Sequence, residues 1–98
     1  MITIHKYPLA IEDTQTVELP EGAEILRVEA LSKDTFPVSV YNAKLFLWAK
    51  VDPEARMVSR TVFIFGTGHE IIPSAARYLG TIFTSPLVFH VFIDAGNH

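Results

Sequence analysis

The stretch Ala43–Phe65, "AKLFLWAKVDPEARMVSRTVFIF", decides the fold class of this chain. Two apolar runs flank the segment "DPEA", in which aspartate favours the first position of a turn and proline fixes φ at the second. We therefore predict a β-hairpin in which Asp52 lies opposite Ala55 and Trp48 lies opposite Ser59.

Side chains alternate between the two faces of such a hairpin, and both faces carry large apolar groups. Trp48 shares one face with Phe46 and Lys44, whereas the other face carries Leu45, Leu47 and Ala49. One interpretation is that one face lines the core and the other forms a subunit interface. The alternative is that Trp48 and a lysine form a stacking platform for a base.

Extended segments separated by turn signals continue along the rest of the chain. We predict further strands at 2–9, 14–19 and 23–31, and two more around a turn at Ser85-Pro86. "LPEG", with Pro20 second and Gly22 last in a turn, predicts a tight hairpin between the second and third strands. "PSAARYLG" predicts a short helical turn near residues 73–79 that ends at Gly80.

These elements predict a single all-β domain over residues 1–98, a small antiparallel sandwich or barrel of about six to seven strands. In the strand at 23–31, alternation places Leu26, Val28 and Ala30 on one face. The connection "SKDTFPVSVYN" at 32–42 is longer than a plain hairpin loop, so it either packs across the open edge of the sheet or covers a ligand.

Composition indicates an oligomer without membrane segments. Hydrophobic residues make up 49% of only 98 residues, and a small domain buries a smaller share of its surface than a large one, so we expect contact with another copy. No run approaches a membrane span, and "MITIHKYPLA" lacks the features of a signal peptide, so we expect a cytoplasmic protein. The absence of cysteine excludes disulfides and thiolate chemistry.

The net charge of −3 is unevenly distributed. Up to Asp34 there are seven acids and three bases, whereas from Thr35 onward there are four acids and five bases. The broad basic surface that duplex nucleic acid requires is missing, but an anionic small molecule could find a basic pocket in the second part.

The segment "FIFGTGHEIIP", Phe63–Pro73, is the strongest candidate for a binding loop. It matches no standard phosphate motif, because Ile71 stands where a dinucleotide fingerprint needs a third glycine and no G-K-[ST] follows. Either the glycines make a tight turn and His69 bonds a neighbour, or the loop holds a phosphate or ribose. The second hypothesis would use a nearby set of polar side chains, namely Thr67, His69, Arg77, Tyr78 and Thr81.

No catalytic or metal constellation is recognisable. The four histidines are scattered, no serine has an activating context, and the adjacent Glu12 and Asp13 would point to opposite faces of a strand. His90, between apolar residues, is interpreted as a hydrogen-bonded interior or interface histidine. We expect neither enzymatic activity nor a metal or cofactor.

The segments "MITIHKYPL", "LPEGAEIL", "LWAKVD", "GTGHEI", "YLGTIF" and "LVFHVF", in this order, resemble a family of small phage and prophage proteins over nearly the whole length. Members of that family have a shorter hairpin where this chain has "SKDTFPVSVYN". The resemblance implies a viral accessory protein in an infected bacterial host. Several small phage proteins of this size sequester the nucleotide signals of bacterial immunity in pockets between subunits.

We therefore expect a non-enzymatic homo-oligomer that binds a small anionic nucleotide-like ligand. The candidate site residues are those that could contact phosphate, ribose or base: Lys6, Trp48, Gly66, Thr67, Gly68, His69, Arg77, Tyr78 and Thr81. The alternative is a module that docks on or inhibits a host protein through an apolar aromatic face, with no small-molecule ligand.

Overall fold

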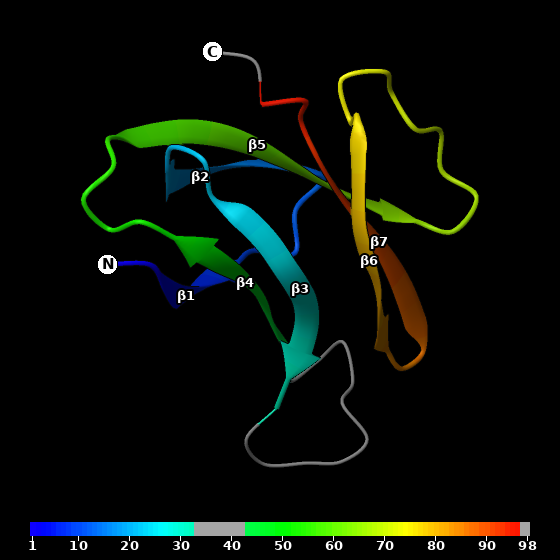
Figure 1. Cartoon of the computed structure of the whole chain (residues 1–98). Helices are drawn as coiled ribbons and strands as arrows, with labels where there is room; N and C mark the ends of the chain where they lie inside the picture. Colours follow the sequence, from blue (N-terminus) through cyan, green and yellow to red (C-terminus); the bar gives the residue numbers. More distant parts are fainter. Residues whose placement is uncertain (33–42, 97–98) are drawn as a thin grey trace.

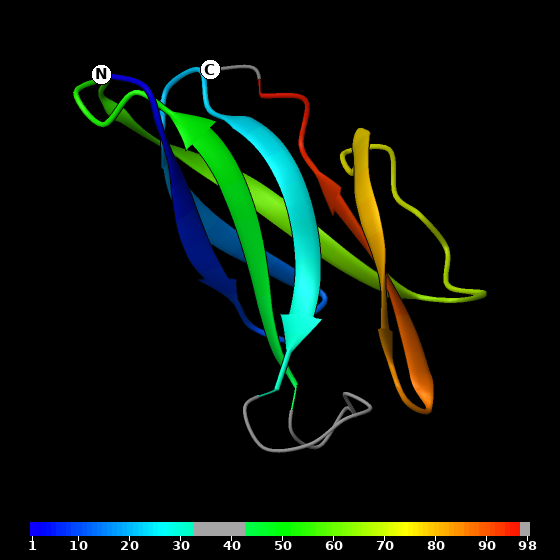
Figure 2. The same ribbon diagram turned by 60° about the horizontal axis from the view of Figure 1, so that its bottom comes forward.

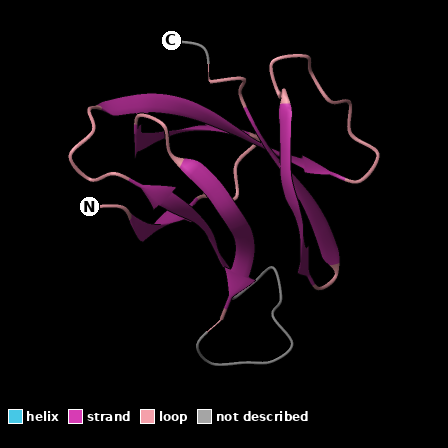
Figure 3. Cartoon of the chain, viewed as in Figure 1, coloured by secondary structure: helices cyan, strands magenta, loops and turns pink. Residues whose placement is uncertain are grey.

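The computed structural model describes residues 1–32 and 43–96, and the predicted connection at 32–42 lies outside them from residue 33 onward. All regular elements of the described chain are strands, in line with the all-β prediction (Figures 1 and 3). The strands are β1 (Thr3–Leu9), β2 (Thr14–Pro20), β3 (Glu24–Leu31), β4 (Lys44–Val51), β5 (Met57–Gly66), β6 (Arg77–Thr84) and β7 (Leu87–Ile93).

The strands form two antiparallel sheets that pack face to face (Figure 2). The order is β1-β4-β3 in the three-stranded sheet and β2-β5-β7-β6 in the four-stranded sheet. All seven strands contribute to one buried apolar cluster, in which Leu19, Leu47, Val62, Ile82 and Val91 are fully buried. Burial of such side chains stabilises the fold by about 1.5–3 kcal/mol each.

The two predicted hairpins around Pro20 and Asp52 are wrong in their pairing, although both turns exist. The Ala55 amide donates to the Asp52 carbonyl at 3.0 Å, and the Ala23 amide donates to the Pro20 carbonyl at 3.1 Å. Each turn passes the chain from one sheet to the other, because β4 pairs with β1 and β3 while β5 pairs with β2 and β7. Trp48 consequently lies opposite Lys6 and Arg27 rather than Ser59.

The predicted helical turn near residues 73–79 is also wrong. A single turn closes there, with the Ala75 amide donating to the Ile72 carbonyl at 3.0 Å, and β6 then begins at Arg77. Two alanines alone favour a helix only weakly, and from Arg77 onward the chain pairs with β7 as a strand. The first part of the predicted helix is thus a turn, and the part from Arg77 onward belongs to strand β6.

A β-bulge changes which side chains of β3 point toward the core. The register shifts between Ile25 and Arg27, so the intervening Leu26 leaves the alternation and is 48% exposed. Val28 and Ala30 are buried as predicted, but Leu26 is not on their face. The same bulge places Arg27 directly opposite Trp48 on the outer face of the sheet.

The two sheets approach each other closely where β3 meets β6 (Figure 1). A Cβ atom on Gly80 would lie 2.7 Å from Cγ2 of Val28, a distance at which either the Val28 side chain or one of the two strands must shift. Gly80, predicted to end a helix, therefore serves inside β6 as the point of contact between the sheets.

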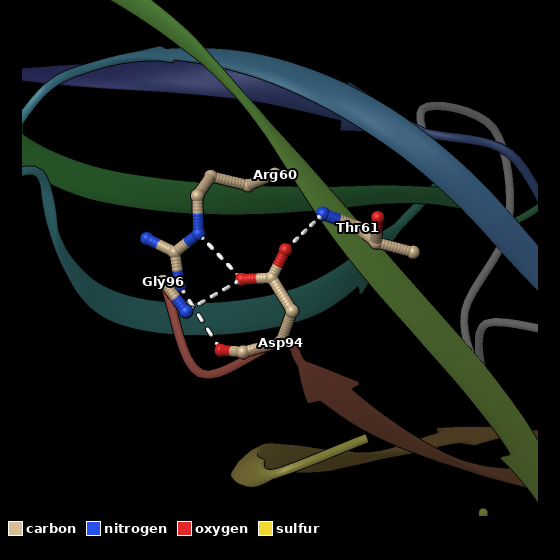
Figure 4. Close-up of polar contacts among 4 residues, drawn as sticks. All are labelled: Arg60, Thr61, Asp94 and Gly96. Carbon is tan, nitrogen blue, oxygen red and sulfur yellow. Dashed lines mark hydrogen bonds and ion pairs between the residues drawn. The ribbon is translucent and has the colours of Figure 1, made fainter. Parts of the chain in front are cut away.

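A partly buried ion pair fastens the chain after β7 to β5 (Figure 4). Arg60 Nε donates to Asp94 Oδ1 at 2.6 Å, and the Thr61 amide donates to Oδ2 at 2.8 Å. The Gly96 amide donates to Oδ1 at 3.0 Å. Although burial raises the pKa of the Asp94 carboxyl, these hydrogen bonds and the Arg60 charge outweigh it, and the net pKa lies below the ordinary value.

Within residues 1–32 and 43–96, no helix is long and apolar enough to cross a lipid bilayer.

Candidate functional site

The loop after β5 begins with a tight turn, as the first of its two interpretations predicts. The His69 amide donates to the Gly66 carbonyl at 3.1 Å, and Gly68 adopts the positive φ of 90° that favours glycine. The Gly66 amide donates to His69 Nδ1 at 3.1 Å, so the neutral ring carries its proton on Nε2. The Gly66 amide is thereby engaged within the turn rather than directed at a ligand.

A chain of hydrogen bonds runs from this turn across β7 to β6. Thr67 Oγ1 lies 2.8 Å from His90 Nε2, and His90 Nδ1 lies 3.0 Å from Thr81 Oγ1. Thr81 Oγ1 in turn lies 2.5 Å from the Tyr78 hydroxyl. The register places Thr81 opposite His90, so strand pairing itself assembles this chain. Both ring nitrogens of His90 have partners, as the sequence led us to expect for an interior or interface histidine.

Aromatic rings pack beside this chain on the outer face of the four-stranded sheet. The Phe65 and Phe92 ring centroids are 5.7 Å apart in an edge-to-face arrangement, and those of Tyr78 and Phe92 are 5.4 Å apart. Phe63 stacks on Phe65 at 6.3 Å and is buried, although it is outside the main core cluster. Strands β5, β7 and β6 thus present a continuous aromatic layer on the outer face of their sheet, with polar groups at one side of it.

The turn, the hydrogen-bond chain and the aromatic layer meet in a concavity of about 250 Å³, which we call the His90 pocket. Its lining combines aromatic rings, two imidazoles and small loop residues: Phe65, Gly66, Thr67, Gly68, His69, Ile71, Tyr78, His90 and Phe92. A second concavity of about 420 Å³ lies on the other side of the same turn and shares Gly66, Thr67 and His69. Glu12 and Asp13 line this second concavity, which makes it unfavourable for an anion.

The structure brings six of the nine predicted site residues together. Gly66, Thr67, Gly68, His69 and Tyr78 line the His90 pocket, and Thr81 joins through its hydrogen bonds. The remaining three lie elsewhere.

Arg77 is exposed at the start of β6 and lies opposite the inward-facing Ile93, on the other side of the strand from Tyr78. Lys6 and Trp48 lie on the outer face of the three-stranded sheet. Among the described residues that line either pocket, none is lysine or arginine.

Sequence reasoning missed Phe65, Ile71, His90 and Phe92 as pocket residues. The alternation in "LVFHVF" already places His90 and Phe92 on one face, but their position beside Phe65 depends on the pairing of β5 with β7. That pairing joins segments far apart in the sequence, and no local motif specifies it.

The lining of the pocket offers stacking and hydrogen-bonding groups. Over the described part of the chain, no group of three or more histidine, aspartate or glutamate side chains could hold a metal ion. Aromatic faces, imidazole nitrogens and hydroxyls are the groups that recognise a planar, hydrogen-bonding ligand.

Comparison with known proteins gives one match. Residues 1–98 match the family described as "Domain of unknown function (DUF7352)", and the chain belongs to this family. No curated protein and no solved structure matches the chain.

Proposed function

We propose that this member of the DUF7352 family is a non-catalytic binding protein that takes the base of a nucleotide-like ligand into the His90 pocket. The observation that carries the proposal is the convergence of three aromatic rings and two imidazoles on one concavity. Aromatic rings stack on the flat faces of bases, and hydroxyl and imidazole groups bond their edges.

The dimensions of the pocket indicate how much of the ligand it takes. Its volume of about 250 Å³ is below the range of roughly 300–1,000 Å³ typical of pockets for drug-sized ligands. One ring system would enter, and the sugar and phosphate would remain at the mouth. Because the described lining holds no lysine or arginine, cations for the phosphate must come from outside this pocket.

A homo-oligomer would supply what one chain lacks. β6 is an edge strand, and on its outer side Tyr78 is 59% exposed and Phe83 is 71% exposed. Apolar groups of this size on an edge strand favour association with another copy. Arg77, exposed on the same strand, is then available to a pocket of a neighbouring copy. The proposal includes the role suggested by the phage resemblance, sequestration of an immune nucleotide signal in the cytoplasm of an infected bacterium.

The test is native mass spectrometry of the purified protein with linear and cyclic nucleotides, followed by calorimetry on any ligand retained. Tyr78→Ala and His69→Ala should each weaken binding by about tenfold, the effect of removing one stacking or hydrogen-bonding group. Met57→Ala is the control, because Met57 is an exposed apolar residue of the same sheet that lies away from β6 and lines neither concavity.

The bound nucleotide should keep its mass, since a binding protein releases its ligand unchanged. The proposal is wrong if no nucleotide binds, or if Met57→Ala weakens binding as much as His69→Ala and Tyr78→Ala do. Conversion of the ligand would establish an enzyme instead.

A second candidate is a protein-docking module. It is favoured by a group of exposed apolar side chains in and after the loop, namely Ile71, Ile72, Tyr78 and Phe83. In that case the protein would ignore every nucleotide, and substitution of Ile72 or Phe83 with serine would abolish capture of a host partner.

A further inference from the structure

We infer that the outer face of the three-stranded sheet binds single-stranded nucleic acid. This surface, which we call the Trp48 face, is separate from the His90 pocket, and the inference does not depend on the pocket having a ligand. The face consists of the outward side chains of β1, β4 and β3. It holds the only tryptophan of the chain.

Strand register arranges the face in rows that cross the sheet. In the central row Trp48 lies directly between Lys6 on one side and Arg27 on the other. In the next row Phe46 lies between Pro8 and Glu29. A partly exposed indole ring with a cation on each side is the arrangement in which a base can stack while its neighbouring phosphates meet positive charge.

Contacts between side chains hold Lys6 in position. Its Nζ lies 4.6 Å from the centroid of the Phe46 ring, and the Phe46 and Trp48 ring centroids are 6.1 Å apart. A cation over an aromatic face is attracted by the negative face of the ring, even at an exposed site. Phe46 thus keeps the ammonium beside the tryptophan, where a phosphate of a stacked nucleotide would lie.

The charge balance of the face favours an anionic partner. It carries four bases, Lys6, Arg27, Lys44 and Lys50, and two acids, Glu24 and Glu29, although the whole chain has a net charge of −3. Both acids are in exposed ion pairs, Glu24 with Lys50 at 3.1 Å and Glu29 with Arg27 at 2.6 Å. Such exposed pairs are weak, so a phosphate can replace the carboxylate. Lys6 and Lys44 have no acidic partner among the described residues.

The same charges argue against a second copy as the occupant. A two-fold symmetric interface would place this positive face against itself, bringing like charges together. Duplex nucleic acid also fits poorly, because its bases are stacked within the helix and cannot reach Trp48, whereas a single strand exposes them. DNA and RNA single strands share the chemistry that the face recognises, and the experiment separates them.

The test is titration with fluorescein-labelled oligo(dT) and oligo(rU) of about 10 nucleotides, within the roughly 4–16 nucleotides that one such surface covers. Binding is followed by anisotropy of the label and by quenching of Trp48 fluorescence. Trp48→Ala should weaken binding by about tenfold or more, whereas Trp48→Phe, which keeps a ring, should retain most of the affinity. Between about 50 and 200 mM salt, affinity should fall by roughly tenfold or more, as expected when two or three phosphates are neutralised.

Lys6→Gln should weaken binding severalfold, and Arg56→Gln is its control. Arg56 is exposed and pairs with Glu21 before β5, so its substitution removes one positive charge away from the Trp48 face. Urea unfolding of each variant confirms that the fold is retained.

The inference is overturned by any of four results. These are no anisotropy change with either oligonucleotide, equal effects of Lys6→Gln and Arg56→Gln, binding of a duplex as tightly as a single strand, or a dimer that Trp48→Ala dissociates. A preference for oligo(rU) over oligo(dT), or the reverse, would identify the natural strand. Failure of the Tyr78 variants to affect nucleotide binding would refute only the pocket.

Discussion

Replacing Asp94 with asparagine should lower the free energy of unfolding by about 3 kcal/mol. Asparagine keeps the size of the side chain but has one acceptor oxygen, so its amide group must face either Arg60 Nε or the Thr61 amide, both of which are donors. A hydrogen bond to a charged group contributes about 1.5–3 kcal/mol, and the buried guanidinium also loses its counter-charge. The expected loss is a large share of the roughly 5–15 kcal/mol that stabilises a typical domain.

Glu29→Gln is the matched control for burial. The Arg27–Glu29 and Arg60–Asp94 pairs have the same separation of 2.6 Å, but the side chains of the first are 69% and 36% exposed and those of the second 10% and 25%. An exposed pair contributes about 0–1 kcal/mol, so Glu29→Gln should have little effect. Urea unfolding at pH 7, followed by Trp48 fluorescence, measures both variants.

The pH dependence gives an independent check of the same ion pair. Because the folded-state pKa of Asp94 is lowered, its carboxylate contributes stability above the unfolded pKa of about 3.9, and this contribution is lost as the pH falls through the folded value. Asparagine does not titrate, so the stability difference between wild type and Asp94→Asn should be full at pH 7 and shrink below about pH 4. If Asp94→Asn lowers the free energy of unfolding no more than Glu29→Gln does, desolvation cancels the attraction between Asp94 and Arg60. A difference that persists unchanged in acid would refute the role of the carboxylate charge.

Three further predictions test the packing. Gly80→Ala should destabilise by about 1–3 kcal/mol, because its Cβ would lie 2.7 Å from Val28 Cγ2, and Val28→Ala in the same chain should relieve part of the effect in urea unfolding; full additivity would contradict the close approach. Thr81→Val should cost about 1 kcal/mol, since it removes the hydroxyl shared by two hydrogen bonds, and an unchanged thermal midpoint would contradict that role. Leu26→Ala should cost less than about 1 kcal/mol and Leu47→Ala about 2–5 kcal/mol, because only Leu47 is buried; equal losses would contradict the bulge.

Local turn chemistry predicted where the chain reverses but not which strand comes next to which. The turn at Asp52 has the predicted hydrogen bond to Ala55, yet β4 and β5 belong to different sheets. The facing of β4 was predictable because alternation depends only on the strand itself, and Leu45, Leu47 and Ala49 are indeed buried on one side. Pairing depends on contacts between distant segments, and turn residues alone do not encode it.

In the candidate site too, features set by adjacent residues could be predicted, whereas features set by strand pairing could not. The turn at Gly66–His69 follows from adjacent residues and was one of the two interpretations of the sequence, including the hydrogen bond that His69 makes to a neighbour. His90 and Phe92 become part of the pocket only because β7 pairs with β5 on one side and β6 on the other. Arg77 was grouped with Tyr78 because the two are adjacent in the sequence, whereas consecutive residues of a strand point to opposite faces.

The nine residues predicted as one site therefore belong to separate surfaces, which constrains how any ligand can use them. The His90 pocket is on the outer side of the four-stranded sheet, and the Trp48 face is on the outer side of the three-stranded sheet, with the core between them. A small nucleotide cannot contact Tyr78 and Trp48 of the same chain. If binding of one nucleotide quenches Trp48 and is also weakened by Tyr78→Ala, the ligand must bridge two copies of the chain. If the ligands that quench Trp48 are not those whose binding Tyr78→Ala weakens, the Trp48 face and the His90 pocket recognise their ligands independently.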